Sequence, residues 1–130
     1  MREFAERYTE AWCSHDPARV AAHYAPDGSL TINGGAPSVG RAAITEAARS
    51  FMDAFTDMQV LMDDVRVEGA KPEYHWTLVG TNMGPGGTGH RVRFSGFEEW
   101  TIGDDGLIAS SLGYFDQAEY DRQIQYGVEA

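Results

Sequence analysis

Two carboxylates in the last third of the chain are the residues best placed to do chemistry. Glu98 lies within an alternating apolar stripe that includes Phe94 and Trp100, and Asp116 directly follows the last apolar stretch. A carboxyl group in apolar surroundings keeps its proton to higher pH, so it can exchange protons with a substrate near neutrality. We therefore take Asp116 and Glu98 as the candidate catalytic residues, and Glu98 is the one whose apolar surroundings suit a group that moves protons or grips a ligand.

Both carboxylates also have a purely structural interpretation. Carboxylates are almost never buried without a partner, so Glu98 is equally consistent with a hydrogen bond to a tyrosine or serine, or with a partner arginine. Asp116 stands where a strand gives way to a helix, and aspartate is a common N-cap at that position. The residues alone leave both interpretations open.

Five aromatic residues are expected to line the interior beside these acids. Large rings dominate the packing of protein cores, so ordinary core burial is the alternative to a binding role. A buried indole N–H needs a hydrogen-bond partner, however, and this favours an interior with some polar content. We expect a small hydrophobic or aromatic molecule as the ligand, contacted by Tyr8, Trp12, Trp76, Trp100 and Tyr114.

Helices dominate the first half of the chain. Apolar residues recur at helical spacing over residues 4–12 and again over residues 44–55. Between them, Asp16-Pro17 is typical of a helix start, because aspartate caps and proline fits the first turn. This predicts a short second helix through about residue 24, followed by a strand over residues 29–33.

The second half changes to the period of two that is typical of strands. Strands are expected over residues 60–67, 73–82, 91–103 and 107–115, with a closing helix through Gln125. A phase slip within the first of these strands indicates a bulge, which bends a sheet. Helices followed by an antiparallel meander favour a single α+β domain over residues 1–130, with a curved antiparallel or mixed sheet wrapped around helices. The space that the helices leave unfilled would be an internal pocket.

The turn between the last two strands decides which side chains share the inner face. A three-residue loop over residues 104–106 pairs Ile102 with Ile108 and buries both apolar stripes together, whereas a two-residue loop separates them. We adopt the three-residue loop, which turns both Trp100 and Tyr114 inward. The two acids then lie about 13 Å apart along the sheet, too far to share a proton.

Composition narrows the classes of partner. The chain has 130 residues with a formal charge of −10, which opposes binding to nucleic acids and to anionic membranes. It carries one cysteine and no cluster of cysteine and histidine at zinc spacing, so we expect neither a disulfide nor a metal. No apolar stretch is long enough to span a membrane, and a cytoplasmic location is the default expectation.

Six short segments follow one another along nearly the whole chain: AWCSHDP, YAPDGSL, Val39-Gly40-Arg41, HWTLVGTNMG, RFSGFEEWTIGDDGLI and YFDQAEYDRQIQYG. Together they resemble the SnoaL-like polyketide cyclases of the nuclear transport factor 2-like superfamily. The resemblance implies a cone of curved sheet and helices around a pocket, often dimerised sheet to sheet. In the cyclases an aspartate at the end of the last strand serves as acid/base for an intramolecular aldol closure, and Asp116 occupies the matching position.

The sequence also departs from the cyclase pattern. Residues 110–113 read SSLG where the cyclases usually have a charged or aromatic run, and the closing motif is stretched to RQIQYG. The same superfamily includes ketosteroid isomerase, limonene epoxide hydrolase and members that only bind a ligand. These departures bear on the activity that the resemblance implies, not on the fold.

We therefore expect a cofactor-independent lyase, isomerase or cyclase that acts on a carbonyl compound by carboxylate acid/base catalysis. The alternative is a non-catalytic module of the same fold, which binds a small ligand or only dimerises. The ligand-binding alternative predicts that Asp116 is consumed as a helix cap. The dimerising alternative predicts no cavity above ~300 Å³, the lower end for ligand sites. Val79, Phe97 and Phe115 are expected on the outer sheet face, where a mixed surface suits a homodimer contact.

Overall fold

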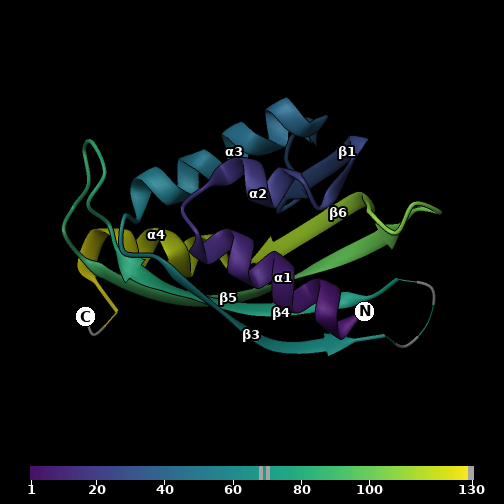
Figure 1. The fold of residues 1–130 in the computed structure, drawn as a ribbon. Coiled ribbons are helices and arrows are strands. Elements are labelled where there is room, and N and C mark those ends of the chain that lie inside the picture. Colours follow the sequence, from purple (N-terminus) through teal and green to yellow (C-terminus); the bar gives the residue numbers. More distant parts are fainter. Residues whose placement is uncertain (68, 70, 129–130) are drawn as a thin grey trace.

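The computed structural model describes residues 1–67, 69 and 71–128, and these residues form a curved sheet with helices on its inner side (Figure 1). The elements in chain order are α1 (Arg2–Cys13), α2 (Pro17–Ala21), β1 (Tyr24–Ile32), β2 (Ser38–Val39), α3 (Arg41–Ala54), β3 (Gln59–Arg66), β4 (Glu73–Thr81), β5 (Arg91–Ile102), β6 (Ile108–Phe115) and α4 (Gln117–Tyr126). The predicted α+β architecture, a curved mixed sheet wrapped around helices, is confirmed.

The sheet has six strands in the order β2-β1-β6-β5-β4-β3. The meander from β3 to β6 is antiparallel as expected, whereas β1 pairs parallel to β6. In Figure 1 α1 crosses the inner side of the long strands, and α3 lies with α2 on the side of β1. The interior between these layers contains the hydrophobic core.

The helix α1 illustrates how the sequence builds that core. Its buried residues recur at positions i, i+3, i+6 and i+7, which form one face of a helix: Ala5, Tyr8, Ala11 and Trp12. Glutamate and arginine occupy the opposite face, where they stay in water. The stripe therefore fixes which side of α1 faces the sheet, and it brings the hydroxyl of Tyr8 into the interior.

The first half of the chain differs from prediction in its strand boundaries. The strand β1 begins at Tyr24 instead of residue 29, so the second helix ends earlier than expected, and the short strand β2 was predicted as loop. A side chain at Gly28 would bring its Cβ to 2.7 Å from the carbonyl oxygen of Ile108. Glycine there allows β1 to approach β6 closely, which local periodicity does not reveal.

The bulge predicted in β3 is confirmed. The pairing of β3 with β4 shifts register between Met62 and Asp64, so that the extra residue, Asp63, has no direct partner. Its carboxylate instead accepts a hydrogen bond from the hydroxyl of Thr77 on β4. The bulge bends the edge of the sheet toward the helices.

The predicted register of β5 and β6 is correct only at the turn. Gly106 is left-handed, with φ of 77°, and Ile102 pairs with Ile108 as expected. An unpredicted bulge follows, because Thr101 pairs with Ser110 and Ala109 is left over. The extra residue reverses the alternation of β6. Trp100 therefore pairs with Ser111, and Glu98 pairs with Gly113 instead of Leu112.

The bulge moves two aromatic residues to the opposite faces from those predicted. Tyr114, expected inside, has its ring on the outer face, where it packs on Phe97 with ring centroids 5.2 Å apart. Phe115, expected outside, turns inward and contacts Trp76 and Phe94. The prediction that Trp100 and Tyr114 turn toward the same enclosed space is therefore wrong.

The helix α4 closes one end of the sheet, beyond the last residue of β6. The side-chain amide of Gln123 accepts a hydrogen bond from the backbone N–H of Arg93 at 2.7 Å and donates to the carbonyl of Arg93 at 2.9 Å. These two bonds satisfy the backbone of β5 at Arg93, beyond the end of β6, where no strand pairs with this side of β5. Gly127 ends the helix with φ of 87°.

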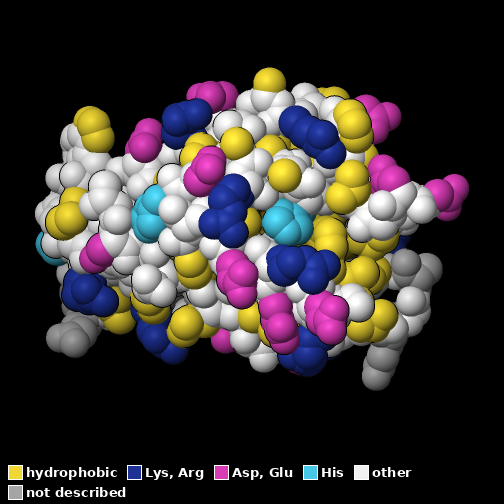
Figure 2. All heavy atoms as spheres, in the orientation of Figure 1, with side chains coloured by type: hydrophobic (Ala, Val, Ile, Leu, Met, Phe, Trp, Pro, Cys, Tyr) yellow, Lys and Arg dark blue, Asp and Glu magenta, His cyan; other side chains and the backbone are white. Residues whose placement is uncertain are grey.

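The surface carries charges of both signs. Figure 2 shows acidic and basic side chains interspersed with apolar ones over the face seen in Figure 1, without a large field of one sign. No helix among the described residues is long and apolar enough to cross a membrane.

Candidate functional site

Glu98 lies at the centre of a buried hydrogen-bond cluster on the inner face of β5. The alternation of the strand turns Glu98 and Trp100 to the same side, and Glu98 is only 7% exposed. Its Oε1 accepts hydrogen bonds from Trp100 Nε1 at 3.0 Å and from Ser111 Oγ at 2.7 Å. The hydroxyls of Tyr8 and Tyr24 lie 2.9 Å and 3.4 Å from the same oxygen. The hydroxyl proton of Tyr24 can be donated either to Oε1 or to the nearer hydroxyl of Tyr8, so side chains from four elements surround this oxygen and at least three of them donate to it.

The other carboxylate oxygen of Glu98, Oε2, can accept further hydrogen bonds. Among the described residues Oε2 accepts only a longer contact, 3.2 Å from the hydroxyl of Tyr8. Burial raises the pKa of the Glu98 carboxyl above its ordinary value, although the hydrogen-bond donors act in the opposite direction. Because Oε1 is surrounded by donors, the proton of the acid form resides on Oε2.

The two tyrosines act as fixed donors to this carboxyl. Their hydroxyl oxygens lie 2.8 Å apart, and burial together with the nearby charge of Glu98 raises the pKa of both well above the ordinary value for tyrosine. Both rings therefore stay neutral. Arg41 at the start of α3 donates from Nε to the carbonyl of Tyr24 at 2.9 Å, which anchors the beginning of β1.

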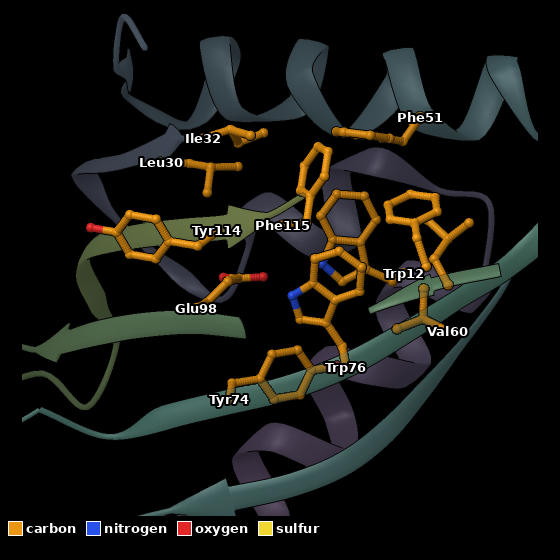
Figure 3. Close-up of a pocket in the computed structure, with 13 residues that line it drawn as sticks. Trp12, Leu30, Ile32, Phe51, Val60, Tyr74, Trp76, Glu98, Tyr114 and Phe115 are labelled. Atoms are coloured by element: carbon orange, nitrogen blue, oxygen red, sulfur yellow. The ribbon is translucent and has the colours of Figure 1, made fainter. Parts of the chain in front are cut away.

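A cavity of about 60 Å³ adjoins Glu98 between α3 and the sheet (Figure 3). Its walls are almost entirely apolar, and Glu98 is the one carboxyl group among the lining residues that the structure describes. The cavity is much smaller than the roughly 300 Å³ at the lower end of typical ligand sites. The lining residues are Trp12, Leu30, Ile32, Phe51, Val60, Tyr74, Trp76, Leu78, Phe94, Glu98, Gly113, Tyr114 and Phe115.

The indole of Trp76 forms the part of the wall next to Glu98. It lies over Gly96, where a Cβ would come within 2.6 Å of Cζ2 of the indole. The rings of Phe94 and Phe115 pack edge-on against it, with centroids 5.7 Å and 6.1 Å away. Glycine at position 96 is therefore what allows the indole to lie against the sheet.

The structure divides the predicted ligand contacts into three groups. Trp12 and Trp76 line the cavity together with Glu98, as expected. Tyr8 and Trp100 lie behind the carboxyl group and hold it, and they are not among the lining residues. Tyr114 borders the cavity, but its side chain is on the outer face and it is 40% exposed.

Asp116 stands apart from this cluster. It is exposed, its Oδ1 accepts a hydrogen bond from the backbone N–H of Glu119 at 3.1 Å, and it does not line the cavity. The carboxylate is thus engaged as the N-cap of α4. Within the described parts of the chain, no three His, Cys, Asp or Glu side chains gather closely enough to hold a metal ion.

Several residues of the site were not singled out from the sequence. Ser111 and Gly113 face inward only because of the bulge at Ala109, which no local signal announces. Tyr24 lies in the YAPDGSL segment that was quoted for the family resemblance, and two tyrosines at the interior could have suggested partners for a buried carboxyl. Phe51 belongs to the apolar stripe of α3, where a wall residue cannot be told from a core residue.

These features define a class of protein: a small α+β domain in which a curved sheet and helices enclose a carboxyl group beside an aromatic cavity. A model of the SnoaL-like domain family matches residues 5–111, and the chain therefore belongs to the SnoaL-like family. No curated protein sequence matches the chain significantly.

Solved structures with the same fold cover nearly the whole chain. A protein assigned as a SnoaL-like polyketide cyclase from Jannaschia sp. CCS1 is 17% identical, with a TM-score of 0.84, covering 96% of this chain and 91% of its own. A protein of ketosteroid isomerase-like fold from Catenulispora acidiphila DSM 44928, in complex with trimethylamine, is 16% identical, with a TM-score of 0.82, and the match covers 98% of this chain and 96% of that protein. The epoxide hydrolase/cyclase-like enzyme SalBIII of polyether salinomycin pyran ring formation is 17% identical, with a TM-score of 0.76 and coverages of 91% and 92%. At these identities the likeness shows the fold.

Proposed function

We propose that this protein binds a small, mostly apolar carbonyl compound in the cavity and that Glu98 moves a proton on it. The observation that carries the proposal is the asymmetry of the Glu98 carboxyl, which lines an aromatic cavity and has one oxygen surrounded by hydrogen-bond donors and one that accepts only the longer contact from Tyr8 among the described residues. The reaction would be of the lyase, isomerase or cyclase type and would need no cofactor.

The proposed chemistry follows from the two states of the carboxyl group. In the ionised state Oε2 removes a proton from the carbon next to the carbonyl, and the electron pair of that C–H bond moves through the carbon–carbon bond to the carbonyl oxygen. The resulting enolate is reprotonated at another atom by Glu98, or its carbon attacks a second carbonyl of the same molecule. The donors on Oε1 stabilise the ionised state, whereas burial raises the pKa of the carboxyl and stabilises the acid form, so the two states act as base and acid in turn.

The relatives lend this proposal general support. The Jannaschia protein is assigned as a SnoaL-like polyketide cyclase and SalBIII as an epoxide hydrolase/cyclase-like enzyme with a role in pyran ring formation, so ring formation is associated with this fold. The Catenulispora protein was solved in complex with trimethylamine, so a member of this fold binds a small molecule.

A ligand-binding protein without catalysis is the second candidate, and one observation favours it. The aspartate that the family resemblance assigns as acid/base is engaged as a helix cap here. Asp116 is exposed and does not line the cavity, so catalysis by Asp116 would take place outside the Glu98 cavity. Binding in the Glu98 cavity needs no contribution from Asp116.

Exchange of deuterium into butanone tests these candidates without knowledge of the natural substrate. We expect the protein in D2O to accelerate exchange of the protons next to the carbonyl, as followed by proton NMR, because Glu98 can remove and return them. Glu98→Gln should abolish the acceleration while keeping the hydrogen-bond acceptor for Trp100 and Ser111.

The matched control is Asp116→Asn, which replaces the other candidate carboxylate and keeps a good capping residue. This variant should exchange butanone as fast as the unmodified protein. Loss of exchange in Asp116→Asn, with full exchange in Glu98→Gln, would transfer the acid/base role to Asp116. Binding of butanone with no accelerated exchange would leave the ligand-binding function in place of catalysis.

A further inference from the structure

The indole N–H of Trp76 is an unused hydrogen-bond donor beside the free oxygen of Glu98. The structure contains three tryptophans, of which Trp100 donates its N–H to Glu98. The N–H of Trp76 has no hydrogen-bond partner among the described residues, although the indole is half-buried and lines the cavity. No buried side-chain nitrogen or oxygen of the described residues lacks a hydrogen-bond partner, so the unpartnered N–H of Trp76 is an accessible donor, and a ligand atom in the cavity can accept its hydrogen bond.

The direction of this donor is visible in the close-up of the site. Figure 3 shows the nitrogen of Trp76 on the side of its ring that is turned toward Glu98. The two groups do not bond to each other, and the cavity adjoins both. A ligand oxygen next to the indole nitrogen would thus have its neighbouring carbon on the side of Glu98.

The remaining walls limit what else the ligand can carry. Apart from Glu98, the described lining residues contribute no charged side chain, and aliphatic or aromatic groups surround the space. An additional polar group on the ligand would lose its water without finding a partner, which is costly. A cation would be attracted only by the ionised state of Glu98, so the charge of the preferred ligand is decided by the binding test.

We propose that Trp76 Nε1–H binds the acceptor oxygen of an uncharged ligand and thereby selects carbonyl compounds over hydrocarbons and over cations of the same size. This proposal rests on the proposed function, because it places the oxygen of the molecule on which Glu98 acts. When a proton passes from the ligand carbon to Oε2 of Glu98, the electron pair displaced onto the oxygen is stabilised by the indole N–H.

Three probes with five heavy atoms each separate the possibilities: butanone, its hydrocarbon counterpart 2-methyl-1-butene, and tetramethylammonium. Each is titrated into ¹⁵N-labelled protein, and the three indole resonances are followed by NMR, with Trp76 assigned from Trp76→Phe. Butanone should move the Trp76 indole proton downfield and leave that of Trp100 nearly in place. Trp76→Phe removes wall contacts from both ligands, so the informative quantity is the preference for butanone over 2-methyl-1-butene, which should fall roughly threefold to tenfold, the range for one hydrogen bond.

The outcomes distinguish failure of this proposal from failure of the proposed function. Equal binding of butanone and 2-methyl-1-butene, or butanone binding that leaves the Trp76 resonance unmoved, would overturn the role of Trp76 while ligand binding stands. Preferential binding of tetramethylammonium would overturn it in favour of a cation site. Absence of any effect from all three probes would overturn both proposals, since the cavity would then bind nothing of this size.

Discussion

Replacing Glu98 with glutamine should change how stability depends on pH. Glutamine has the same shape, and its carbonyl can accept the hydrogen bonds of Oε1, but it has no proton to lose. The pKa of Glu98 is raised in the folded protein, so the folded state holds this proton more tightly than the unfolded state does. Ionisation of Glu98 therefore costs folding free energy, and Glu98→Gln removes that cost.

The pH dependence of the free energy of unfolding follows from the linkage between proton binding and folding. Below the unfolded pKa of glutamate, about 4.3, the Glu98 carboxyl is protonated in both the folded and the unfolded state, so the free energies of unfolding of the unmodified protein and of Glu98→Gln differ by a constant amount. Between that pH and the raised folded pKa, the unmodified protein loses about 1.4 kcal/mol of stability per pH unit relative to Glu98→Gln. Above the folded pKa the difference becomes constant again. The variant should therefore gain relative stability as the pH rises.

Urea unfolding at a series of pH values between 4 and 8 measures this difference, with tryptophan fluorescence as the signal. Glu99→Gln is the matched control, because Glu99 is the next residue on β5 and makes an ion pair with Lys71 at 3.6 Å near the surface. A flat profile for Glu98→Gln, or a loss of relative stability with rising pH, would refute the raised pKa and with it the acid form of Glu98.

Further predictions concern the cavity wall, the cap of α4 and the outer face. Gly113→Ala places a methyl group in ordinary van der Waals contact, 3.7 Å from Cγ of Glu98, so the free energy of unfolding in urea should change by less than about 1 kcal/mol. Butanone binding followed by NMR should be weaker, because the methyl group takes up space in the cavity. Unchanged binding would contradict the position of the cavity. Asp116→Ala should lower the free energy of unfolding by about 1 kcal/mol through loss of the cap, with butanone exchange retained. We propose a homodimer through the outer sheet face, where Tyr114 packs on Phe97; sedimentation should then show a dimer that Tyr114→Arg dissociates, and a monomeric unmodified protein would contradict it.

The sequence allowed the helices and the long strands to be predicted because their signals are local. The apolar stripes of α1 and α3, the alternation in β4 and β5, and the phase slip at the β3 bulge are all visible within a few residues. Glu98 was identified in the same way, as a charged residue on an apolar stripe. The partners that satisfy it come from α1, β1 and β6, which are distant in sequence, so they could only be named as a tyrosine or a serine.

The errors in the predicted site arose where strand pairing between distant parts of the chain decides which face a side chain occupies. The single extra residue Ala109 reverses every side chain of β6, which exchanged Tyr114 for Phe115 and brought in Ser111. The parallel pairing of β1 with β6 connects the two halves of the chain and leaves no periodic signal. For Asp116 the sequence offered a capping role and a catalytic role. The structure shows the cap, and the catalytic role remains a prediction for the exchange assay.

A titration of the Glu98 carboxyl carbon by ¹³C NMR tests the central claim most directly. The resonance is assigned by its absence from Glu98→Gln. We predict that the Glu98 signal titrates above the ordinary pKa of glutamate, about 4.3, because burial disfavours the charged form, and that it shifts when butanone is added. A midpoint at or below that value would show that the hydrogen-bond donors outweigh burial, and the carboxyl could not then act as the acid/base of the cavity.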